Sequence, residues 1–148
     1  WKIRLAKQEM DEKARVALEM VTADKVICGE QQPESDHFAA MDESFIGDDN
    51  GRHWRAVRQN GWFSYVLNSS GIRCEYVRFV CAGREGSEAT VEINGNEAGT
   101  VKIAGTGEEI HVIMIPDEFR NADLITAKVM HTGEGISPKF YETRLVKE

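Results

Sequence analysis

Large side chains alternate with smaller or polar ones between residues 62 and 67, and this two-residue period most constrains the fold. The alternation places three residues on one face of an extended chain and two on the other: Phe63, Tyr65 and Leu67, then Trp62 and Val66. Asn60-Gly61 precedes the run and Asn68-Ser69-Ser70-Gly71 follows it, and both are turn-forming sequences. The segment is therefore predicted to be a strand, buried on at least one side and bounded by turns.

Similar runs recur to the C-terminus. The predicted strands, about eight to ten at intervals of roughly 8–12 residues, cover residues 25–28, 53–58, 62–67, 76–82, 89–93, 101–103, 110–115, 124–131 and 139–146. Residues 29–37 and 42–52 are predicted to be irregular, and residues 117–123 allow one helical turn. Because no segment after residue 25 is helical enough for crossover connections, we predict an all-β fold. It is an antiparallel, jelly-roll-like β-sandwich of the galactose-binding-domain-like type, preceded by a helix.

The first 22 residues follow a helical period instead. Apolar residues recur there near a 3.6-residue spacing, without Gly or Pro between them: Ile3, Met10, Ala14, Ala17, Leu18 and Val21. This stripe packs either on the sandwich or on a preceding domain, and we favour a connecting helix. Since the chain begins at Trp1 without an initiator Met, we expect residues 1–22 to be a linker helix from an absent upstream domain and residues 23–148 to be the sandwich.

Composition excludes several classes of function. The net charge of −7 argues against nucleic acid as a partner, because phosphate binding needs a local excess of Lys and Arg. No apolar run approaches the ~20 residues that span a bilayer, so no membrane partner is expected. The three cysteines, Cys28, Cys74 and Cys81, include no C-x-x-C pair, so neither a disulfide framework nor a zinc knuckle is indicated. One disulfide, such as Cys28 to Cys74, stays open as an alternative.

No arrangement typical of a catalytic centre is found in the sequence. A G-x-S-x-G elbow is absent, and the Gly-containing segments 83–86 and 105–107 match neither a phosphate loop nor a dinucleotide fingerprint. Carboxylates are frequent between residues 30 and 49, but nothing pairs two of them across a bond, and solvated loop charges explain them. We therefore expect no catalytic residues, and a protein that is not an enzyme.

Metal ligands are also scattered. The four histidines, His37, His53, His111 and His131, are widely spaced, and alternation could point the last two outward, so no shared zinc site is expected. Asp48-Asp49-Asn50-Gly51 resembles a calcium loop but lacks the alternate-position oxygens and the closing Glu. We expect no cofactor, with a structural calcium ion in the acidic loops as the alternative.

Aromatic residues on a sandwich suggest sugar binding. The C–H face of a sugar packs on an aromatic ring, and polar side chains beside the ring then fix the hydroxyl groups. Trp54 and Trp62 are the candidate platforms, and the alternative for each is a place in the core. The candidate polar neighbours, which would complete a glycan site, are His53, Arg55, Arg58, Asp36 and His37.

Four segments together resemble a known family. They are Gly29-Glu30-Gln31-Gln32-Pro33-Glu34 with Asp36-His37, then His53-Trp54-Arg55, Gly61-Trp62-Phe63-Ser64-Tyr65 and Phe140-Tyr141-Glu142-Thr143-Arg144-Leu145. Over residues 10–148 the chain is similar to the C-terminal accessory region of bacterial β-L-arabinofuranosidase-like proteins, glycoside hydrolase family 127. In that family a longer Gly- and Arg-containing loop precedes the Trp-Arg pair, where residues 48–51 stand here. The catalytic glutamate and zinc-binding cysteines of the family lie in an upstream barrel and have no counterparts in this chain.

The resemblance implies a secreted or periplasmic glycan-degrading protein. Its implied partners are an upstream catalytic domain of the same polypeptide and a plant-type glycan. We therefore expect a non-catalytic accessory module of a secreted glycoside hydrolase that binds carbohydrate weakly. The alternative is a purely structural domain, which packs against the upstream catalytic domain and stabilises it.

Overall fold

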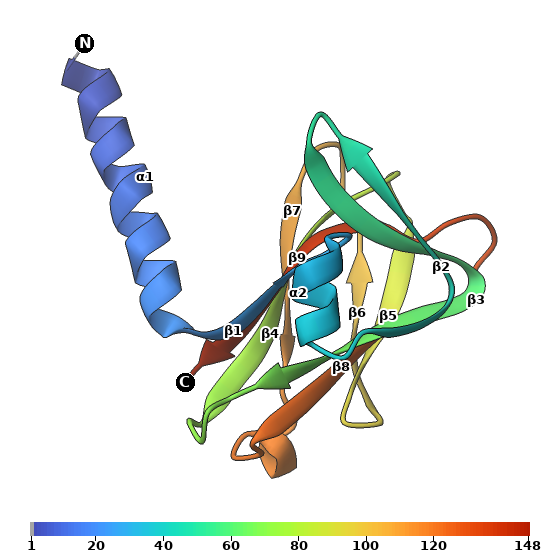
Figure 1. Cartoon of the computed structure of the whole chain (residues 1–148). Coiled ribbons are helices and arrows are strands. Elements are labelled where there is room, and N and C mark those ends of the chain that lie inside the picture. The colour runs from blue at the N-terminus through green and yellow to red at the C-terminus, as the bar shows by residue number, and fades with distance from the viewer. Residues whose placement is uncertain (1) are drawn as a thin grey trace.

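The computed structural model describes the backbone of residues 2–148 and the side chains from residue 6 onward; Trp1 and the side chain of Ile3 lie outside the described residues. The elements are α1 (Lys2–Val21), β1 (Thr22–Ile27), α2 (Gln31–Asp36), β2 (Ala40–Asp49), β3 (Arg52–Asn68), β4 (Cys74–Ala82), β5 (Glu88–Ile93), β6 (Asn96–Lys102), β7 (Glu109–Met114), the 3-10 turn η1 (Asp117–Phe119), β8 (Leu124–His131) and β9 (Lys139–Lys147). Figure 1 shows the helix α1 projecting from a body built of strands.

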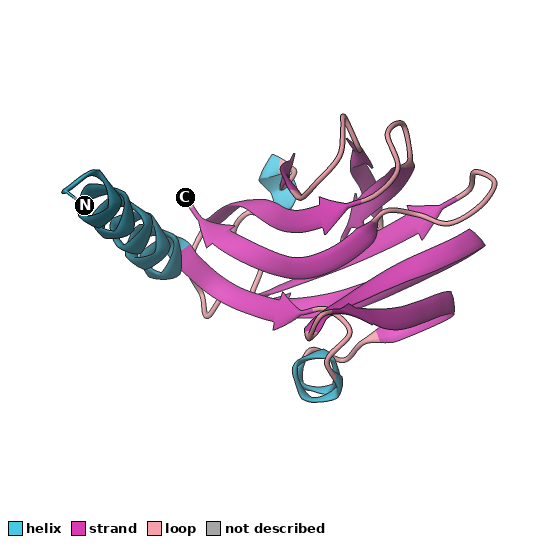
Figure 2. Ribbon diagram, turned by 90° about the horizontal axis from the view of Figure 1, so that it is seen from above, coloured by secondary structure: helices cyan, strands magenta, loops and turns pink. Residues whose placement is uncertain are grey.

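The strands form two curved layers, which Figure 2 shows from above. One layer has the order β2-β3-β8-β5-β6 and the other the order β1-β9-β4-β7, and all strand pairs are antiparallel. The layers are joined at one edge, where Arg55 of β3 pairs with Phe140 of β9. The predicted antiparallel, jelly-roll-like sandwich with an N-terminal helix is confirmed.

The core lies between the layers and follows the predicted alternation. Phe63 and Leu67 of β3 are fully buried, as is Phe79 of β4 in the facing layer. Phe140 of β9 packs edge-on between them, with its ring centroid 5.6 Å from that of Phe63 and 5.6 Å from that of Phe79. Burying each such side chain contributes about 1.5–3 kcal/mol, so this cluster is a main source of stability.

Two segments predicted to be irregular are regular. Residues 29–37 contain the helix α2, and most of residues 42–52 belong to the strand β2, which pairs along β3. The helix is short and polar, so its formation depends on tertiary contacts rather than on periodicity. Because β2 is an edge strand rich in exposed acidic residues, it shows no alternation between apolar and polar residues.

The predicted turn at Asn60-Gly61 is a bulge inside one long strand. The register between β2 and β3 shifts here, between Asp42 and Ser44, and Asn60 adopts the left-handed conformation with φ 63°. A Cβ on Gly61 would lie 2.7 Å from the carbonyl oxygen of Glu43, so only glycine fits. The Asn-Gly signal therefore bends β3 without ending it.

The three cysteines are free and buried, so the alternative of a Cys28–Cys74 disulfide is not realised. Burial raises the pKa of Cys28 to about 12 and the pKa of Cys81 to about 12. Thiols that stay protonated are poor nucleophiles. These residues therefore act as small core side chains.

The helix α1 stands away from the sandwich. Met10 is 70% exposed and Met20 is 72% exposed, so its apolar stripe is not covered by the rest of the described chain. The base of the helix is fixed by Arg144, whose Nη1 lies 3.0 Å from the Glu19 carboxylate, and by Lys147, whose Nζ donates to the carbonyl oxygen of Met20. None of the described helices has the length and hydropathy of a membrane span.

A buried ion pair holds α2 against β3. The guanidinium of Arg55 donates to both oxygens of Glu34, from Nε at 2.6 Å and from Nη2 at 2.8 Å, and the Tyr65 hydroxyl donates to the same carboxylate. Arg55 Nη1 also donates to Ser44 of β2 at 2.9 Å. Burial alone would raise the pKa of Glu34, but the hydrogen bonds from Arg55 and Tyr65 outweigh it and lower the pKa. The carboxylate is thus ionised and fully paired.

Replacing Glu34 by glutamine is expected to destabilise the fold strongly. The change leaves the buried Arg55 charge unpaired, which costs about 3–5 kcal/mol. Urea unfolding of Glu34→Gln measures the loss, with the exposed Gln31→Ala on the same helix as control. The double variant Glu34→Leu with Arg55→Leu should recover part of the loss, because no charge is then buried. A loss below about 1 kcal/mol would contradict this assignment.

Candidate functional site

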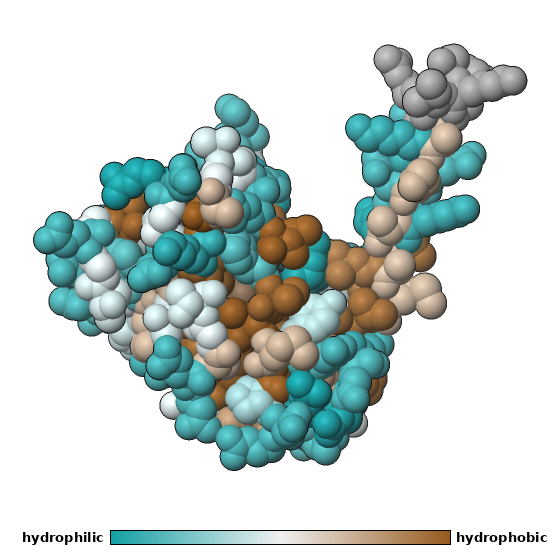
Figure 3. Space-filling model, turned by 180° about the vertical axis from the view of Figure 1, so that it is seen from behind, coloured by the Kyte–Doolittle hydropathy of each residue, from teal (hydrophilic) through white to brown (hydrophobic). Residues whose placement is uncertain are grey.

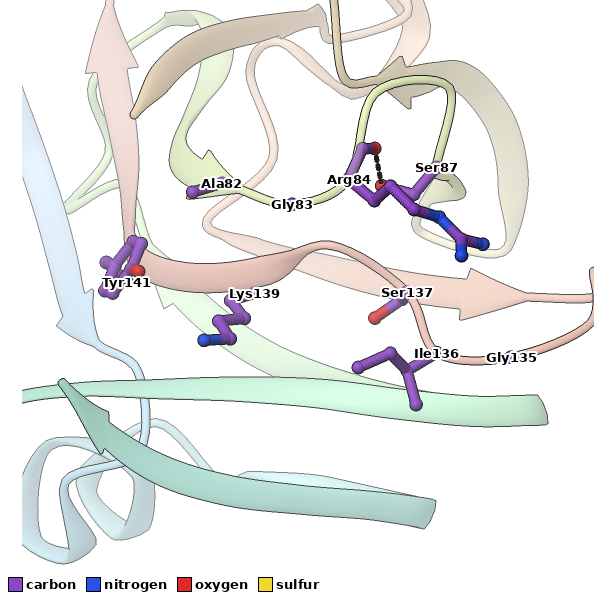
Figure 4. Close-up of a pocket in the computed structure, with 9 residues that line it drawn as sticks. All are labelled: Ala82, Gly83, Arg84, Ser87, Gly135, Ile136, Ser137, Lys139 and Tyr141. Atoms are coloured by element: carbon purple, nitrogen blue, oxygen red, sulfur yellow. Dashed lines mark hydrogen bonds between the residues drawn. The ribbon is translucent and has the colours of Figure 1, made fainter. Parts of the chain in front are cut away.

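A pocket of about 590 Å³ opens at one end of the sandwich, where loops from both layers meet. Its wall is formed by the β4–β5 loop, the β8–β9 loop and the start of β9. The larger side chains that line it come in pairs from these three segments: Arg84 and Ser87, Ile136 and Ser137, and Lys139 and Tyr141. Figure 4 shows Lys139, Ser137 and Ile136 extending toward the space above β3.

Asp49 at the end of β2 organises one side of the pocket. Its Oδ2 accepts a hydrogen bond from the Tyr141 hydroxyl at 3.0 Å and lies 3.3 Å from Lys139 Nζ. The hydrogen bond from Tyr141 and the Lys139 charge lower the pKa of Asp49. Arg52 places its guanidinium 4.6 Å from the centroid of the Tyr141 ring. This network holds an aromatic ring and an ammonium group at the pocket wall.

The two serines of the pocket serve the loops. Ser137 Oγ accepts a hydrogen bond from the Val57 amide at 3.0 Å and donates to the Pro138 carbonyl at 2.8 Å. Ser87 Oγ donates to the carbonyl oxygen of Arg84 at 2.7 Å. The Arg84 guanidinium is exposed and forms no ion pair with the residues described. Arg84 and Lys139 are therefore the groups best placed to donate hydrogen bonds to a ligand.

The structure places Trp54, one predicted platform, beside this pocket. Its ring centroid lies 4.8 Å from Lys139 Nζ, and its indole covers Gly47, where a Cβ would lie only 2.1 Å from Cζ2. Phe45 packs edge-on against it at 5.7 Å. The Nε1 atom of Trp54 is buried and forms no hydrogen bond of standard geometry with the described residues, but it lies near enough to Asp49 to help lower the pKa of that carboxylate.

Trp62, the other predicted platform, contacts different elements. It is half-buried and lies on the outer face of its layer, because it alternates with the buried Phe63. Lys128 Nζ of β8 lies 4.5 Å from its ring centroid. The two tryptophans therefore do not line a common site in this structure.

The two arginines among the predicted polar neighbours are engaged elsewhere. The Arg55 side chain is 8% exposed and its donors are taken by Glu34 and Ser44, so it supports the fold from inside. The guanidinium of Arg58 stacks on the Phe45 ring, 4.4 Å from its centroid. Neither lines the pocket.

The remaining predicted neighbours lie around α2 and β1. His37 ends α2, where Nε2 lies 2.7 Å from Asp24 and Nδ1 lies 2.6 Å from the carbonyl oxygen of Pro33. Asp36 is exposed and accepts a hydrogen bond from Gln32 at 2.8 Å. His53 lies 3.5 Å from the Glu30 carboxylate. These residues surround the helix and do not gather into a site with Trp54.

The acidic residues 48–51 form the end of β2 and its hairpin turn. Asn50 and Gly51 take the left-handed conformation, with φ 56° and 89°. Within the described residues, no group of three or more His, Cys, Asp and Glu side chains could hold a metal ion. The outward orientation expected for His131 is wrong, since this residue continues the inward row of β8 and is 5% exposed.

The pocket residues Arg84, Ile136 and Lys139 were missed by the sequence analysis. Arg84 lies about 50 residues before Ile136 and Lys139, and the segments around them match no motif. The only available signals were the glycines that flank both loops and the strand position of Tyr141. Proximity between such loops is a tertiary property.

Comparison with known proteins gives a family and a fold. The family model "Family of unknown function (DUF6805)" matches residues 17–146, and the chain belongs to this family. No curated protein sequence matches the chain. Among solved structures, the fold is that of carbohydrate-binding modules with a jelly-roll sandwich.

Three solved structures illustrate the likeness. A family 35 carbohydrate-binding module from Clostridium thermocellum has a TM-score of 0.61 at 13% identity, covering 85% of this chain and 100% of that one. A family 6 carbohydrate-binding module has a TM-score of 0.63 at 8% identity, covering 86% and 95%. An exo-β-1,3-galactanase from Phanerochaete chrysosporium has a TM-score of 0.56 at 11% identity, covering 84% of this chain and 29% of the enzyme.

The contact between His37 and Asp24 predicts a pH-dependent stability. Burial alone would lower the pKa of His37, but the hydrogen bonds to Asp24 and Pro33 raise it above its usual value. A raised pKa means that this stabilisation is complete below the unfolded-state pKa of about 6.5 and is lost as pH rises through the folded-state pKa. His37→Ala should therefore cost more unfolding free energy at pH 5.5 than at pH 9, measured by urea unfolding.

Asp24→Asn is the matched variant for this measurement. It keeps an oxygen that accepts the Asn68 amide but removes the charge that faces His37. It should reduce the same pH dependence. An equal cost of His37→Ala at both pH values would contradict the assignment.

Proposed function

We propose that this chain is a non-catalytic carbohydrate-binding module and that it binds glycan in the pocket at the loop end. The observation that carries the proposal is the pocket itself, about 590 Å³ in volume, in which apolar surface lies next to the cationic donors Arg84 and Lys139. Ligand pockets in proteins usually have volumes of about 300–1,000 Å³ and combine apolar walls with a few polar groups.

The chemistry of the lining suits a sugar. Ile136, 50% exposed, offers apolar surface to the C–H groups of a sugar ring. Lys139 and Arg84 donate hydrogen bonds to hydroxyl groups, and Asp49 holds Lys139 in place while providing a nearby acceptor. The described residues that line the pocket bring no pair of carboxylates together for glycosidic hydrolysis.

The finer role that we propose is that of an accessory module in a secreted or periplasmic glycoside hydrolase. Two observations support it: similar folds are found in carbohydrate-binding modules, and another match covers 29% of an exo-β-1,3-galactanase. The resemblance to β-L-arabinofuranosidase-like proteins makes arabinose-containing plant glycans the first ligands to test. In this role the partner is an upstream catalytic domain of the same polypeptide.

Replacing Lys139 by methionine is expected to weaken glycan binding about tenfold, since a charged hydrogen bond to the ligand is lost. The matched control is Lys128→Met, because Lys128 also stacks on a tryptophan but lies away from the pocket. Calorimetry with arabino-oligosaccharides measures the dissociation constants, and thermal unfolding confirms that both variants fold. Binding should also change the fluorescence of Trp54, an effect that is lost in Trp54→Phe and kept in Trp62→Phe.

Two outcomes would contradict the proposed site. Equal weakening by both lysine variants would show that the effect is not local to the pocket. Failure of the wild-type chain to bind any member of an arabinan, xylan and galactan oligosaccharide panel would remove the glycan-binding function altogether.

A second candidate function, packing against a neighbouring domain, is favoured by the outer face of the β1-β9-β4-β7 layer. Ile110, Val112 and Met114 form one row on β7 and are 60%, 50% and 45% exposed. On the neighbouring strand β4, Tyr76 and Val80 pair with Met114 and Ile110, and Arg78 between them pairs with Val112. Figure 3 views the molecule from behind and shows hydrophobic surface that extends to the base of α1. Apolar patches of this kind often mark protein contacts.

For this second function we expect a substitution that acts only in the longer polypeptide. Val112→Asp should leave the melting temperature of this chain nearly unchanged, because Val112 is half exposed. In the longer polypeptide it should cost about 1.5–3 kcal/mol, the contribution of a buried valine. Thermal unfolding of both forms measures this, with Thr100→Asp on β6 as control. Equal effects in the two forms would contradict a docking role.

A further inference from the structure

His131 presents a hydrogen-bond acceptor that the fold does not use. Its Nδ1 lies 2.9 Å from the carbonyl oxygen of Glu88. A carbonyl oxygen only accepts, so Nδ1 carries the hydrogen, and in the neutral ring Nε2 then offers a lone pair. Nε2 is buried and has no hydrogen-bond partner among the described residues. Leaving such an atom unpaired is unfavourable, which points to a ligand group as its partner.

The ring borders a second hollow of about 280 Å³, lined by residues of the β4–β5 and β8–β9 loops. Gly133, which also lines this hollow, lies against the edge of the imidazole. A Cβ at this position would lie 3.3 Å from Cε1 and 3.9 Å from Nε2 of His131. The glycine thus packs close to the ring edge, and a side chain at this position would press on the imidazole.

The other groups around the hollow restrict the ligand class. Glu85, Glu88 and Glu134 are exposed carboxylates in the lining, and they disfavour an anion. A metal ion is disfavoured as well, because the described residues form no cluster of three ligands. A neutral ligand with several hydroxyl donors fits this acceptor-rich wall best, and sugars are of this class.

The second hollow adjoins the pocket. Both are lined by Arg84, Ser87 and Ile136, so a ligand that extends past Ile136 enters both. We infer that His131 forms a second subsite, in which Nε2 accepts a hydrogen bond from a sugar hydroxyl, and that the ligand is an oligosaccharide of at least two units. The inference rests on the proposed glycan-binding function.

His131→Asn tests the subsite. The asparagine amide can keep the hydrogen bond to the Glu88 carbonyl, because its Nδ2 occupies the place of Nδ1, while the acceptor at Nε2 is removed. Calorimetry with L-arabinose, arabinotriose and xylotriose measures affinity by ligand length. We expect the best trisaccharide to bind the variant about tenfold more weakly, and the monosaccharide to bind within about twofold of wild type. His53→Asn, a surface histidine away from both hollows, should change neither.

A second variant and a direct probe keep the test independent of how His131→Asn folds. Gly133→Val adds a side chain against the ring edge and should reproduce the length-dependent loss with the imidazole intact. In the wild-type chain, the ¹⁵N resonance of His131 Nε2 should shift on addition of the trisaccharide and stay in place with the monosaccharide.

The outcomes separate the subsite from the pocket. Equal losses for both ligand lengths, no loss for the trisaccharide, or equal wild-type affinity for monosaccharide and trisaccharide would overturn the subsite while leaving the glycan pocket intact. A wild-type chain that binds no sugar of any length would overturn both.

Discussion

The buried ion pair between Glu34 and Arg55 fixes the geometry on which the rest of the structure depends. Arg55 lies where a strand of one layer pairs with a strand of the other, opposite Phe140, and its side chain also ties α2 and β2 to β3. One residue away, Trp54 turns the other way and lies beside Lys139 at the pocket. The buried charge of Arg55 needs its partner Glu34, and this pairing sets the orientation of β3. The opposite face of β3 borders the candidate site.

Much of the fold could be predicted because a strand with one buried face shows alternating apolar and polar residues in its sequence. The strand β8 matches its predicted bounds, residues 124–131, since its inward side chains are all buried. The prediction of secondary structure failed for segments that are not stabilised by a buried apolar face. α2 is held by one buried carboxylate in a polar segment, and β2 is an acidic edge strand with little buried surface. At Asn60-Gly61 a turn signal produced a bulge, because the neighbouring strand continued past it.

The candidate site was predicted less well, for a related physical reason. The sequence pointed to polar residues as neighbours of the tryptophans, but in the structure several of them pair with other charged groups: Arg55 with Glu34, and His37 with Asp24. Charged side chains close to a core are usually paired with an opposite charge or a hydrogen-bond partner, and are then not available to a ligand. The cationic groups at the pocket, Arg84 and Lys139, lie in or beside loops at the end of the sandwich, where backbone position rather than periodicity decides proximity.

Two buried polar atoms without partners among the described residues, Trp54 Nε1 and His131 Nε2, both belong to residues at the loop end. One is a donor and the other is an acceptor in the neutral ring. An anion would satisfy only the donor, and a metal ion only the acceptor. A hydroxyl group both donates and accepts, so the sugar ligand that we propose for the loop end is compatible with both atoms. The apolar row on β7, which offers no unpaired polar atom, fits a protein contact instead.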